Sequence, residues 1–318
     1  MADSTYQAGI YRRQGGNELV IAPAGLLNVQ GQLTGLQSGK KFVTGSAVGS
    51  VTGSVAGASA NDGFSYVTPK ATLIQGQTLA TASTGDRVHV MPGHVESVTG
   101  AAGMTFSKAG VRYIGEGVGR NRPKISFTTA IDAQIIISGA NIAFHNFVFD
   151  FAGFDAITAA ISITGADVSF DDCEFITNVA DKGVVLGILT AATATRLRFS
   201  RCRFIGTPAN TGTTTTAQIK HEVGVDYVIE DCYFCGKVVN NLLNATTILQ
   251  GLIARNIFHT GTGTASISLE AASTPFIVGN DFCVASGTAP VIGAGASYSD
   301  NHYTTEGNGP TAGTALAF

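Results

Sequence analysis

The adjacent carboxylates Asp171 and Asp172 are the first candidates for chemistry in this chain of 318 residues. Clustered carboxylates can act as general acid and base on a glycosidic bond, or hold Ca²⁺ beside a basic residue. Both uses need further acidic, basic or histidine side chains near the two aspartates. The sequence contains no Gly-His-Gly motif, and no Lys/Arg pair with neighbouring acids recurs. We therefore expect a structural role for both aspartates and keep them as the fallback catalytic pair.

Two other local patterns could carry chemistry. Cys232 and Cys235 form a single Cys-x-x-Cys pair, whereas zinc needs four ligands and a thioredoxin-like site needs a βαβ unit. His89 and His94 flank a Pro-Gly turn without a recognisable third ligand. We therefore expect no catalytic residue beyond the fallback pair, no metal and no cofactor.

The segment Lys220-His221-Glu222 places a base beside an acid. Consecutive residues of a strand point to opposite faces, so His221 and Glu222 would not serve one site together. We expect an exposed loop or strand edge here.

The composition excludes several classes of protein. The chain is 44% hydrophobic and only 13% charged, which excludes global disorder, and its 40 glycines argue against helical bundles. The 19 basic and 22 acidic residues give a net charge of −3, so no nucleic-acid partner is expected. No apolar run is long enough to span a membrane and no signal peptide is recognisable, so we expect synthesis in the cytoplasm and no membrane partner. The low charge leads us to expect a surface rich in Thr, Ser, Asn and Gly, part of which is buried between subunits.

An internal repeat organises the second half of the chain. Seven segments end on an aromatic residue, at intervals of 26, 29, 30, 24, 24 and 21 residues. Each reads as a short alternating strand, a bend and a second short strand, and such units stack into a solenoid. The repeated aromatics, which we expect to stack in the core, are Phe149, Phe175, Phe204, Phe234, Phe258, Phe282 and Tyr303.

Two further columns follow from the same alignment. Two positions before the aromatic, the repeats carry Cys173, Cys202, Cys232, Asn256 and Asn280, which we expect to stack on their own kind. Three positions before it stand Asp172, Arg201, Asp231 and Arg255. Opposite charges on neighbouring strands stabilise a sheet, so this column predicts an alternating charge ladder.

The stretch that precedes the repeats contains Gly85-Asp86-x-Val88-x-Val90-x-Pro92-Gly93. It resembles the first coils of the pectin-lyase-like right-handed parallel β-helix superfamily, whose members include lyases, hydrolases and non-enzymatic structural proteins. The resemblance implies an all-β fold, a right-handed parallel β-helix with an N-terminal extension of short strands. We expect residues 1–80 to form the extension and residues 81–318 the β-helix with its C-terminal cap or tail.

A second resemblance concerns the opening Thr5–Ala22 together with the motif at 109–123, Ala-Gly-Val-x-x-Ile-Gly-x-Gly-x-Gly-Arg-Asn-Arg-Pro. The two motifs in this order look like small virion structural proteins of tailed bacteriophages. The resemblance implies a capsid decoration (cement) protein on the virion surface, bound to the major capsid protein and forming a homotrimer. Residues 1–80 would then contact the shell or a neighbouring subunit, through Tyr6, Tyr11, Arg12 and Arg13. The alternative is a tail-spike-type polysaccharide depolymerase or lyase.

Overall fold

The structure is a computed structural model that describes residues 10–12, 19–21, 39–45, 55–179, 181–207, 213–222, 224–245, 248–261, 264–285, 288–293 and 296–305. The chain divides into two compact units, Met1–Gln37 and Ser38–Phe318. In the first unit, β1 (Ile10–Arg12) pairs antiparallel with β2 (Leu19–Ile21). Tyr11 and Arg12 belong to β1, whereas Tyr6 and Arg13 lie outside the described residues.

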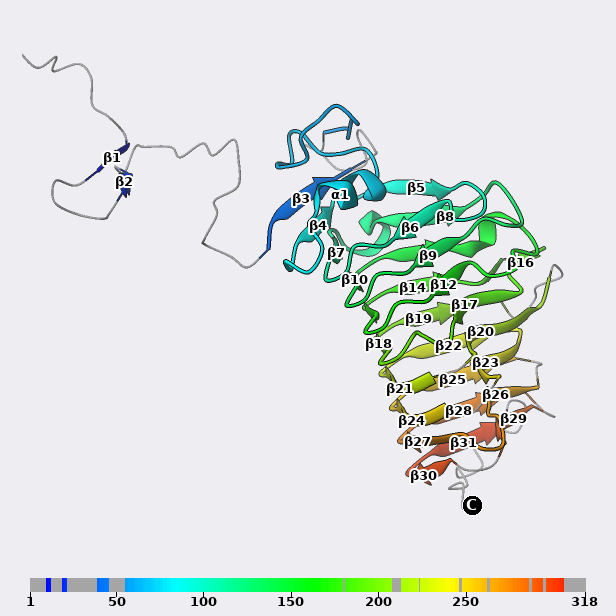
Figure 1. Ribbon diagram of the computed structural model, residues 1–318. Helices are drawn as coiled ribbons and strands as arrows, with labels where there is room; N and C mark the ends of the chain where they lie inside the picture. Colours follow the sequence, from blue (N-terminus) through cyan, green and yellow to red (C-terminus); the bar gives the residue numbers. More distant parts are fainter. Residues whose placement is uncertain are drawn as a thin grey trace, which may run out of the picture. The chain divides into compact units, whose positions relative to one another are not determined.

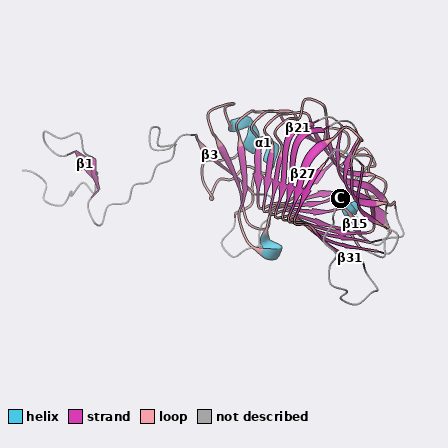
Figure 2. Cartoon of the chain, turned by 90° about the horizontal axis from the view of Figure 1, so that it is seen from below, coloured by secondary structure: helices cyan, strands magenta, loops and turns pink. Residues whose placement is uncertain are grey.

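The second unit is a right-handed parallel β-helix in which three sheets run along the same axis (Figures 1 and 2). The prediction of an all-β parallel solenoid is confirmed. The ten-stranded sheet consists of β3 (Lys41–Thr44), β4 (Arg87–Val90), β7 (Arg112–Gly115), β10 (Ala143–His145), β13 (Ser169–Asp171), β18 (Arg198–Ser200), β21 (Gly224–Glu230), β24 (Ile248–Ala254), β27 (Thr274–Val278) and β30 (Ser297–Ser299).

The other two sheets complete each coil. The nine-stranded sheet contains β5 (Val95–Val98), β8 (Lys124–Phe127), β11 (Val148–Asp150), β14 (Glu174–Ile176), β19 (Arg203–Ile205), β22 (Tyr233–Gly236), β25 (Ile257–Thr260), β28 (Asp281–Val284) and β31 (His302–Thr305). The eight-stranded sheet contains β6 (Met104–Phe106), β9 (Ile135–Ile137), β12 (Ile161–Ile163), β17 (Leu186–Thr190), β20 (Thr215–His221), β23 (Val238–Asn244), β26 (Ala265–Ser268) and β29 (Ala289–Ile292). A small hairpin, β15 (Asn178–Val179) with β16 (Lys182–Gly183), is inserted before β17.

From β10 onward, a sharp two-residue corner joins each strand of the ten-stranded sheet to the next strand of the nine-stranded sheet. Its first residue has a positive φ in coil after coil, for example 53° at Asp172, 53° at Arg201 and 54° at Asp231. This left-handed conformation is costly for residues other than glycine. Its repetition places the side chains of the corner residues in one column on the outside of the β-helix.

The core of the β-helix contains columns of stacked aromatic rings. Phe175 is the register partner of both Phe149 and Phe204, and the column continues through Phe234, Phe258 and Phe282 to Tyr303. Consecutive phenylalanine rings of this column stack with centroids 4.5–5.1 Å apart. These phenylalanines are at most 1% exposed, so each coil buries a large apolar surface against its neighbours.

The second corner residue points inward and forms a buried polar column. Asn280 accepts a hydrogen bond from the backbone N–H of Asn256 and donates its amide to the carbonyl of Ile253, both at 2.9 Å. Asn256 bonds the N–H of Cys232 in the same way, and Cys232 Sγ accepts from the N–H of Cys202 at 3.4 Å. The thiols of Cys173, Cys202 and Cys232 thus take positions that Asn occupies in later coils. All three are buried, free cysteines.

The N-terminal end of the β-helix includes residues that we had expected in the extension. Strand β3 pairs with β4, and helix α1 (Leu73–Leu79), capped by the side chain of Thr72, packs beside them. Gln77 of α1 donates to the carbonyl of Thr105 and accepts from the hydroxyl of Tyr113. The compact unit therefore begins at Ser38 rather than near residue 81, because α1 covers apolar side chains of the first coils.

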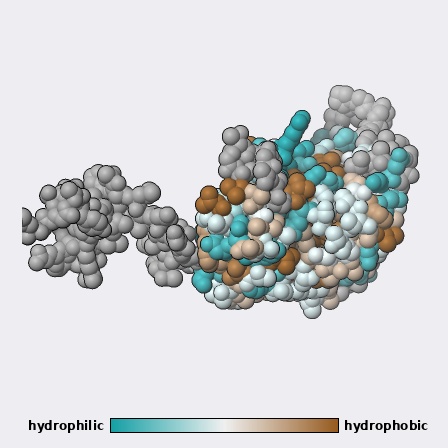
Figure 3. Space-filling model, turned by 90° about the horizontal axis from the view of Figure 1, so that it is seen from above, coloured by the Kyte–Doolittle hydropathy of each residue, from teal (hydrophilic) through white to brown (hydrophobic). Residues whose placement is uncertain are grey.

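Apolar side chains also reach the surface at this end. Phe64, Tyr66 and Val67 are exposed in the loop before α1, and the view from above shows brown patches interspersed with teal ones (Figure 3). Within the described residues, the only α-helix has 7 residues and is too short to cross a membrane.

Candidate functional site

Asp171 and Asp172 lie on the outside of the β-helix, where β13 meets its corner. Asp171 is the register partner of His145 on β10, so the two side chains project from neighbouring strands of one sheet. His145 Nδ1 lies 3.3 Å from an oxygen of Asp171 and 3.6 Å from one of Asp172. All three side chains are partly exposed.

Arg201, at the corner of the next coil, binds both aspartates. Its Nε donates to Asp172 Oδ1 at 2.9 Å, and one terminal nitrogen donates to Asp172 Oδ2 at 3.2 Å and to Asp171 Oδ1 at 2.5 Å. The hydrogen bonds to Asp172 raise the pKa of the Arg201 guanidinium above its ordinary value. A bidentate pair of this kind fixes the guanidinium in orientation as well as in position.

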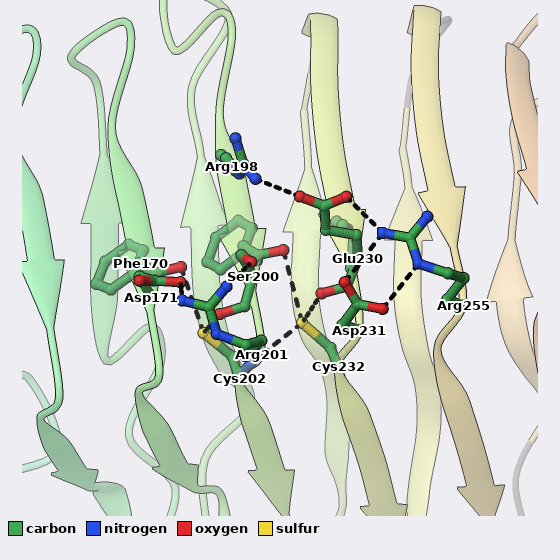
Figure 4. Close-up of polar contacts among 12 residues, drawn as sticks. Phe170, Asp171, Arg198, Ser200, Arg201, Cys202, Glu230, Asp231, Cys232 and Arg255 are labelled. Atoms are coloured by element: carbon green, nitrogen blue, oxygen red, sulfur yellow. Dashed lines mark hydrogen bonds and ion pairs between the residues drawn. The ribbon is translucent and has the colours of Figure 1, made fainter.

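The same arrangement recurs two coils further on (Figure 4). Arg255 donates through Nε to Asp231 at 2.8 Å and through a terminal nitrogen to Glu230, also at 2.8 Å. Glu230 also accepts from Arg198. These hydrogen bonds from Arg255 lower the pKa of Asp231. The four residues of the expected ladder therefore lie in one column as two tight pairs, each joining an arginine to the acid of the coil before it.

A shallow hollow with a volume of about 440 Å³ lies beside these residues on the ten-stranded sheet. Arg112 borders it at one end and Arg198 at the other. The row of register partners between them consists of the small residues Ala143 and Ser169. The hollow thus brings His145 and Asp171 together with three arginines from two coils, Arg112 of one and Arg198 and Arg201 of the other.

The chemistry open to this site is restricted by Arg201. A glycosidase needs one carboxylic acid in surroundings that keep it protonated, together with a second carboxylate across the bond. Here both carboxylates accept hydrogen bonds from one guanidinium. The ligand atoms of His145, Asp171 and Asp172 lie within 4.8 Å of one another, close enough to hold a metal ion. A cation there would compete with Arg201 for the same carboxylate oxygens.

The remaining arginines of this region are also paired. Arg196 binds Asp167 through two hydrogen bonds of 2.6 Å, and Arg203 lies 3.6 Å from Glu174. The cluster Arg196, Arg198, Arg201 and Arg203 is thus offset by acids of neighbouring coils. His89 pairs with Glu116 and His94 with Glu96, and these two histidines have no carboxylate in common.

His221 does not lie at an exposed edge, and that expectation was wrong. It is only 1% exposed because it occupies an inward position of β20, where its ring stacks on Tyr227 with centroids 4.6 Å apart. Its Nδ1 lies 3.2 Å from the hydroxyl of Thr190, while Nε2 has no hydrogen-bond partner in the described structure. Burial lowers the pKa of His221 to about 4.

Sequence reasoning did not single out His145 or Glu230. Both occupy the position four residues before the repeated aromatic, in the same alignment column as Asp171. That column would have predicted the contact between His145 and Asp171, because equivalent positions of neighbouring coils are register partners.

Comparison with known proteins identifies the fold. No family model and no curated protein sequence matches the chain. Among solved structures, the chain is similar to a rhamnogalacturonan lyase, with 12% identity and a TM-score of 0.52 over 83% of this chain and 87% of that one.

Two further structures are a surface protein and adhesin, PfbA, of Streptococcus pneumoniae (8% identity, 71% of this chain and 87% of that one) and ORF18 of Geobacillus virus E2 (12%, 73% and 58%). Both have a TM-score of 0.29, so only the comparison with the lyase bears on the fold. The chain is a parallel β-solenoid protein. Its particular architecture is the pectin-lyase-like right-handed parallel β-helix, a fold that does not by itself define an activity.

Proposed function

We propose that this protein is a non-catalytic structural component of a bacteriophage virion that decorates and stabilises the capsid shell. The observation that carries the proposal is the use of Asp171 and Asp172: both bind Arg201, and the same pairing recurs with Arg255. The side chains of these acids and arginines thus link successive coils of the β-helix. The order of the two sequence motifs, at Thr5–Ala22 and 109–123, supports the virion role.

In this proposal the N-terminal segment contacts the major capsid protein or a neighbouring subunit, through Tyr6, Tyr11, Arg12 and Arg13, and the protein assembles as a homotrimer. Added buried interface stabilises the assembled shell by mass action. The first unit ends at Gln37, so deleting residues 1–37 removes the proposed contact segment and spares the strands of the β-helix.

Two measurements test the proposal. Mass spectrometry of purified virions should find hundreds of copies for each particle, relative to the major capsid protein. The chain lacking residues 1–37 should keep its β-sheet circular dichroism and lose binding to capsids. Absence from virions, or undiminished binding by the truncated chain, would refute the role.

A depolymerase remains the second candidate, because the 440 Å³ hollow gathers His145, Asp171 and Arg198 on one face. Assays of glycan cleavage with the intact chain and with Asp171→Asn and Asp172→Asn decide this point. Cleavage that both substitutions abolish, with unchanged thermal unfolding, would establish an enzyme and reject the non-catalytic role.

A further inference from the structure

Three cations follow one another on the outer face of the ten-stranded sheet. Lys41 on β3 is the register partner of Arg87 on β4, which in turn is the register partner of Arg112 on β7. Neighbouring strands lie about 4.8 Å apart, and like charges directly opposite one another destabilise a sheet. The Lys41 ammonium contacts Tyr66. Arg87 and Arg112 form no ion pair or side-chain hydrogen bond within the described part of the chain.

This lack of pairing sets the two arginines apart from most others of the β-helix. Those that bind a carboxylate on a neighbouring coil or loop are Arg122, Arg196, Arg198, Arg201, Arg203 and Arg255. The sequence thus supplies an acid beside each of those guanidinium groups, but places two adjacent guanidinium groups on β4 and β7 without one. Their mutual repulsion would be relieved by a negative charge from outside the chain.

The surroundings of Arg87 and Arg112 can accommodate such a charge. A hollow with a volume of about 530 Å³ is lined by both arginines together with Ser83, Gly85, Gly110 and Asn141. None of these lining residues is acidic. The side chain of Asn141, whose φ is 56°, has no hydrogen-bond partner among the described residues. Two guanidinium groups, an amide and a hydroxyl therefore converge as available donors.

The hollow continues along the sheet toward Arg198. Arg112 lines both this hollow and the 440 Å³ hollow described above. The row Arg87, Arg112, Ala143, Ser169 and Arg198 spans four strand intervals, or about 19 Å. An elongated surface with two cations unpaired in the described chain at one end, small residues along its floor and the paired Arg198 at the other end fits an extended chain better than a single ion.

We propose that this surface, the basic row of Arg87 and Arg112 with its continuation over Ala143 and Ser169, binds an acidic, extended segment of a partner protein. Guanidinium groups bind carboxylates through two parallel hydrogen bonds, and alternate side chains of an extended segment point to the same side. The rings along the floor, Tyr113, Phe144 and Phe170, are at most 1% exposed. The floor therefore offers no aromatic platform on which a base or a sugar ring could stack.

This surface lies on the β-helix and not on the N-terminal segment, so its partner need not be a capsid protein. Fluorescence anisotropy of a labelled peptide of alternating glutamate and serine, titrated with the full chain, tests it. We expect salt-sensitive binding that weakens at least about tenfold in Arg87→Ser/Arg112→Ser. The matched control is Arg120→Ser, because Arg120 is exposed and lies outside this surface.

Thermal unfolding gives a second readout. Without peptide, the double variant should unfold at the same or a higher temperature than the wild type, because substitution removes a like-charge contact. Equal binding by wild type and double variant, or an equal loss in Arg120→Ser, would overturn the proposal. It would also be overturned if a galacturonic-acid oligomer or inorganic sulfate bound the row more tightly than the peptide.

Discussion

Arg201 and Asp172 occupy equivalent corners of neighbouring coils, and two nitrogens of Arg201 donate hydrogen bonds to the carboxylate of Asp172, at 2.9 and 3.2 Å. Both residues adopt a left-handed backbone conformation, with φ of 53°. The corner conformation thus directs an acid and a base of consecutive coils toward each other on the outside of the β-helix. The contact explains why a pair of adjacent aspartates need not imply catalysis.

The first prediction concerns this pair. Arg201→Ala should destabilise the protein by about 0.5–1 kcal/mol, the upper range for exposed ion pairs. Arg201→Glu should cost more, because it sets a third carboxylate against Asp171 and Asp172. Urea unfolding at low and high salt measures the stability of both variants. The loss of stability relative to the wild type should become smaller with added salt. The same charge reversal at Arg120, which is exposed and has no ion pair among the described residues, is the control. An equal loss in Arg120→Glu would show that the pairing is unimportant.

The second prediction concerns the inward corner column. Asn280→Ala should destabilise the β-helix by roughly 2–3 kcal/mol, because it leaves the N–H of Asn256 buried without the amide oxygen and removes the hydrogen bond to the carbonyl of Ile253. Asn280→Cys should cost less, since the thiol of Cys232 accepts the equivalent N–H at 3.4 Å. Thermal and urea unfolding of the two variants test the ranking. Equal losses would mean that the thiol does not replace the amide.

The third prediction concerns the aromatic column. Phe204 stacks on Phe175 and Phe234, with centroids 4.6 and 4.5 Å away. Phe204→Ala should cost about 3–5 kcal/mol, because it removes both stacked-ring contacts and the edge contact with Phe199 and leaves a cavity. Phe276→Ala, at a position 46% exposed on β27, should change stability by less than about 0.5 kcal/mol. Urea midpoints measure the two variants, and similar shifts would contradict the assignment of the column to the core.

The fourth prediction concerns pH. Burial lowers the pKa of His221 from 6.5 to about 4, so the unfolded chain takes up a proton at a higher pH than the folded chain. Stability should therefore fall as the pH drops from about 6.5 to about 4, by up to roughly 3 kcal/mol if this group acts alone. Guanidinium unfolding across this range measures the slope.

The matched variants for that experiment are His221→Phe, which keeps a ring beside Tyr227, and His302→Asn, which removes an exposed histidine. The first should flatten the pH dependence below pH 6.5, and the second should leave it unchanged. A slope that persists in His221→Phe would assign it to other groups.

Much of the β-helix could be predicted from the sequence because one part of the repeat, from the strand before the corner to the strand after it, keeps the same length from coil to coil. The strand before the corner, the two corner residues and the strand after it occupy fixed positions relative to the aromatic. Counting back from Phe175 and Phe204 therefore places Asp172 beside Arg201 and Cys173 beside Cys202. The contact of His145 with Asp171 could have been predicted in the same way, because both residues lie four positions before the repeated aromatic.

Other features could not be read in this way. His221 lies in β20, where Ala217, Gln218 and Ile219 are all buried, so simple alternation does not predict which side of the strand faces inward. The division near residue 38 was also missed, because α1 and β3 lie in a stretch without the repeat and their place depends on packing against later coils.

The columns of the repeat follow from spacing along the chain, since equal spacing within each coil makes equivalent residues neighbours once parallel strands stack. The row of Lys41, Arg87 and Arg112, in contrast, depends on how distant segments pack. These residues are separated by loops of unequal length and by helix α1, so no spacing in the sequence aligns them. Their register follows from how the first coils pack beneath that helix, and the packing leaves two adjacent guanidinium groups without an acid from the described chain.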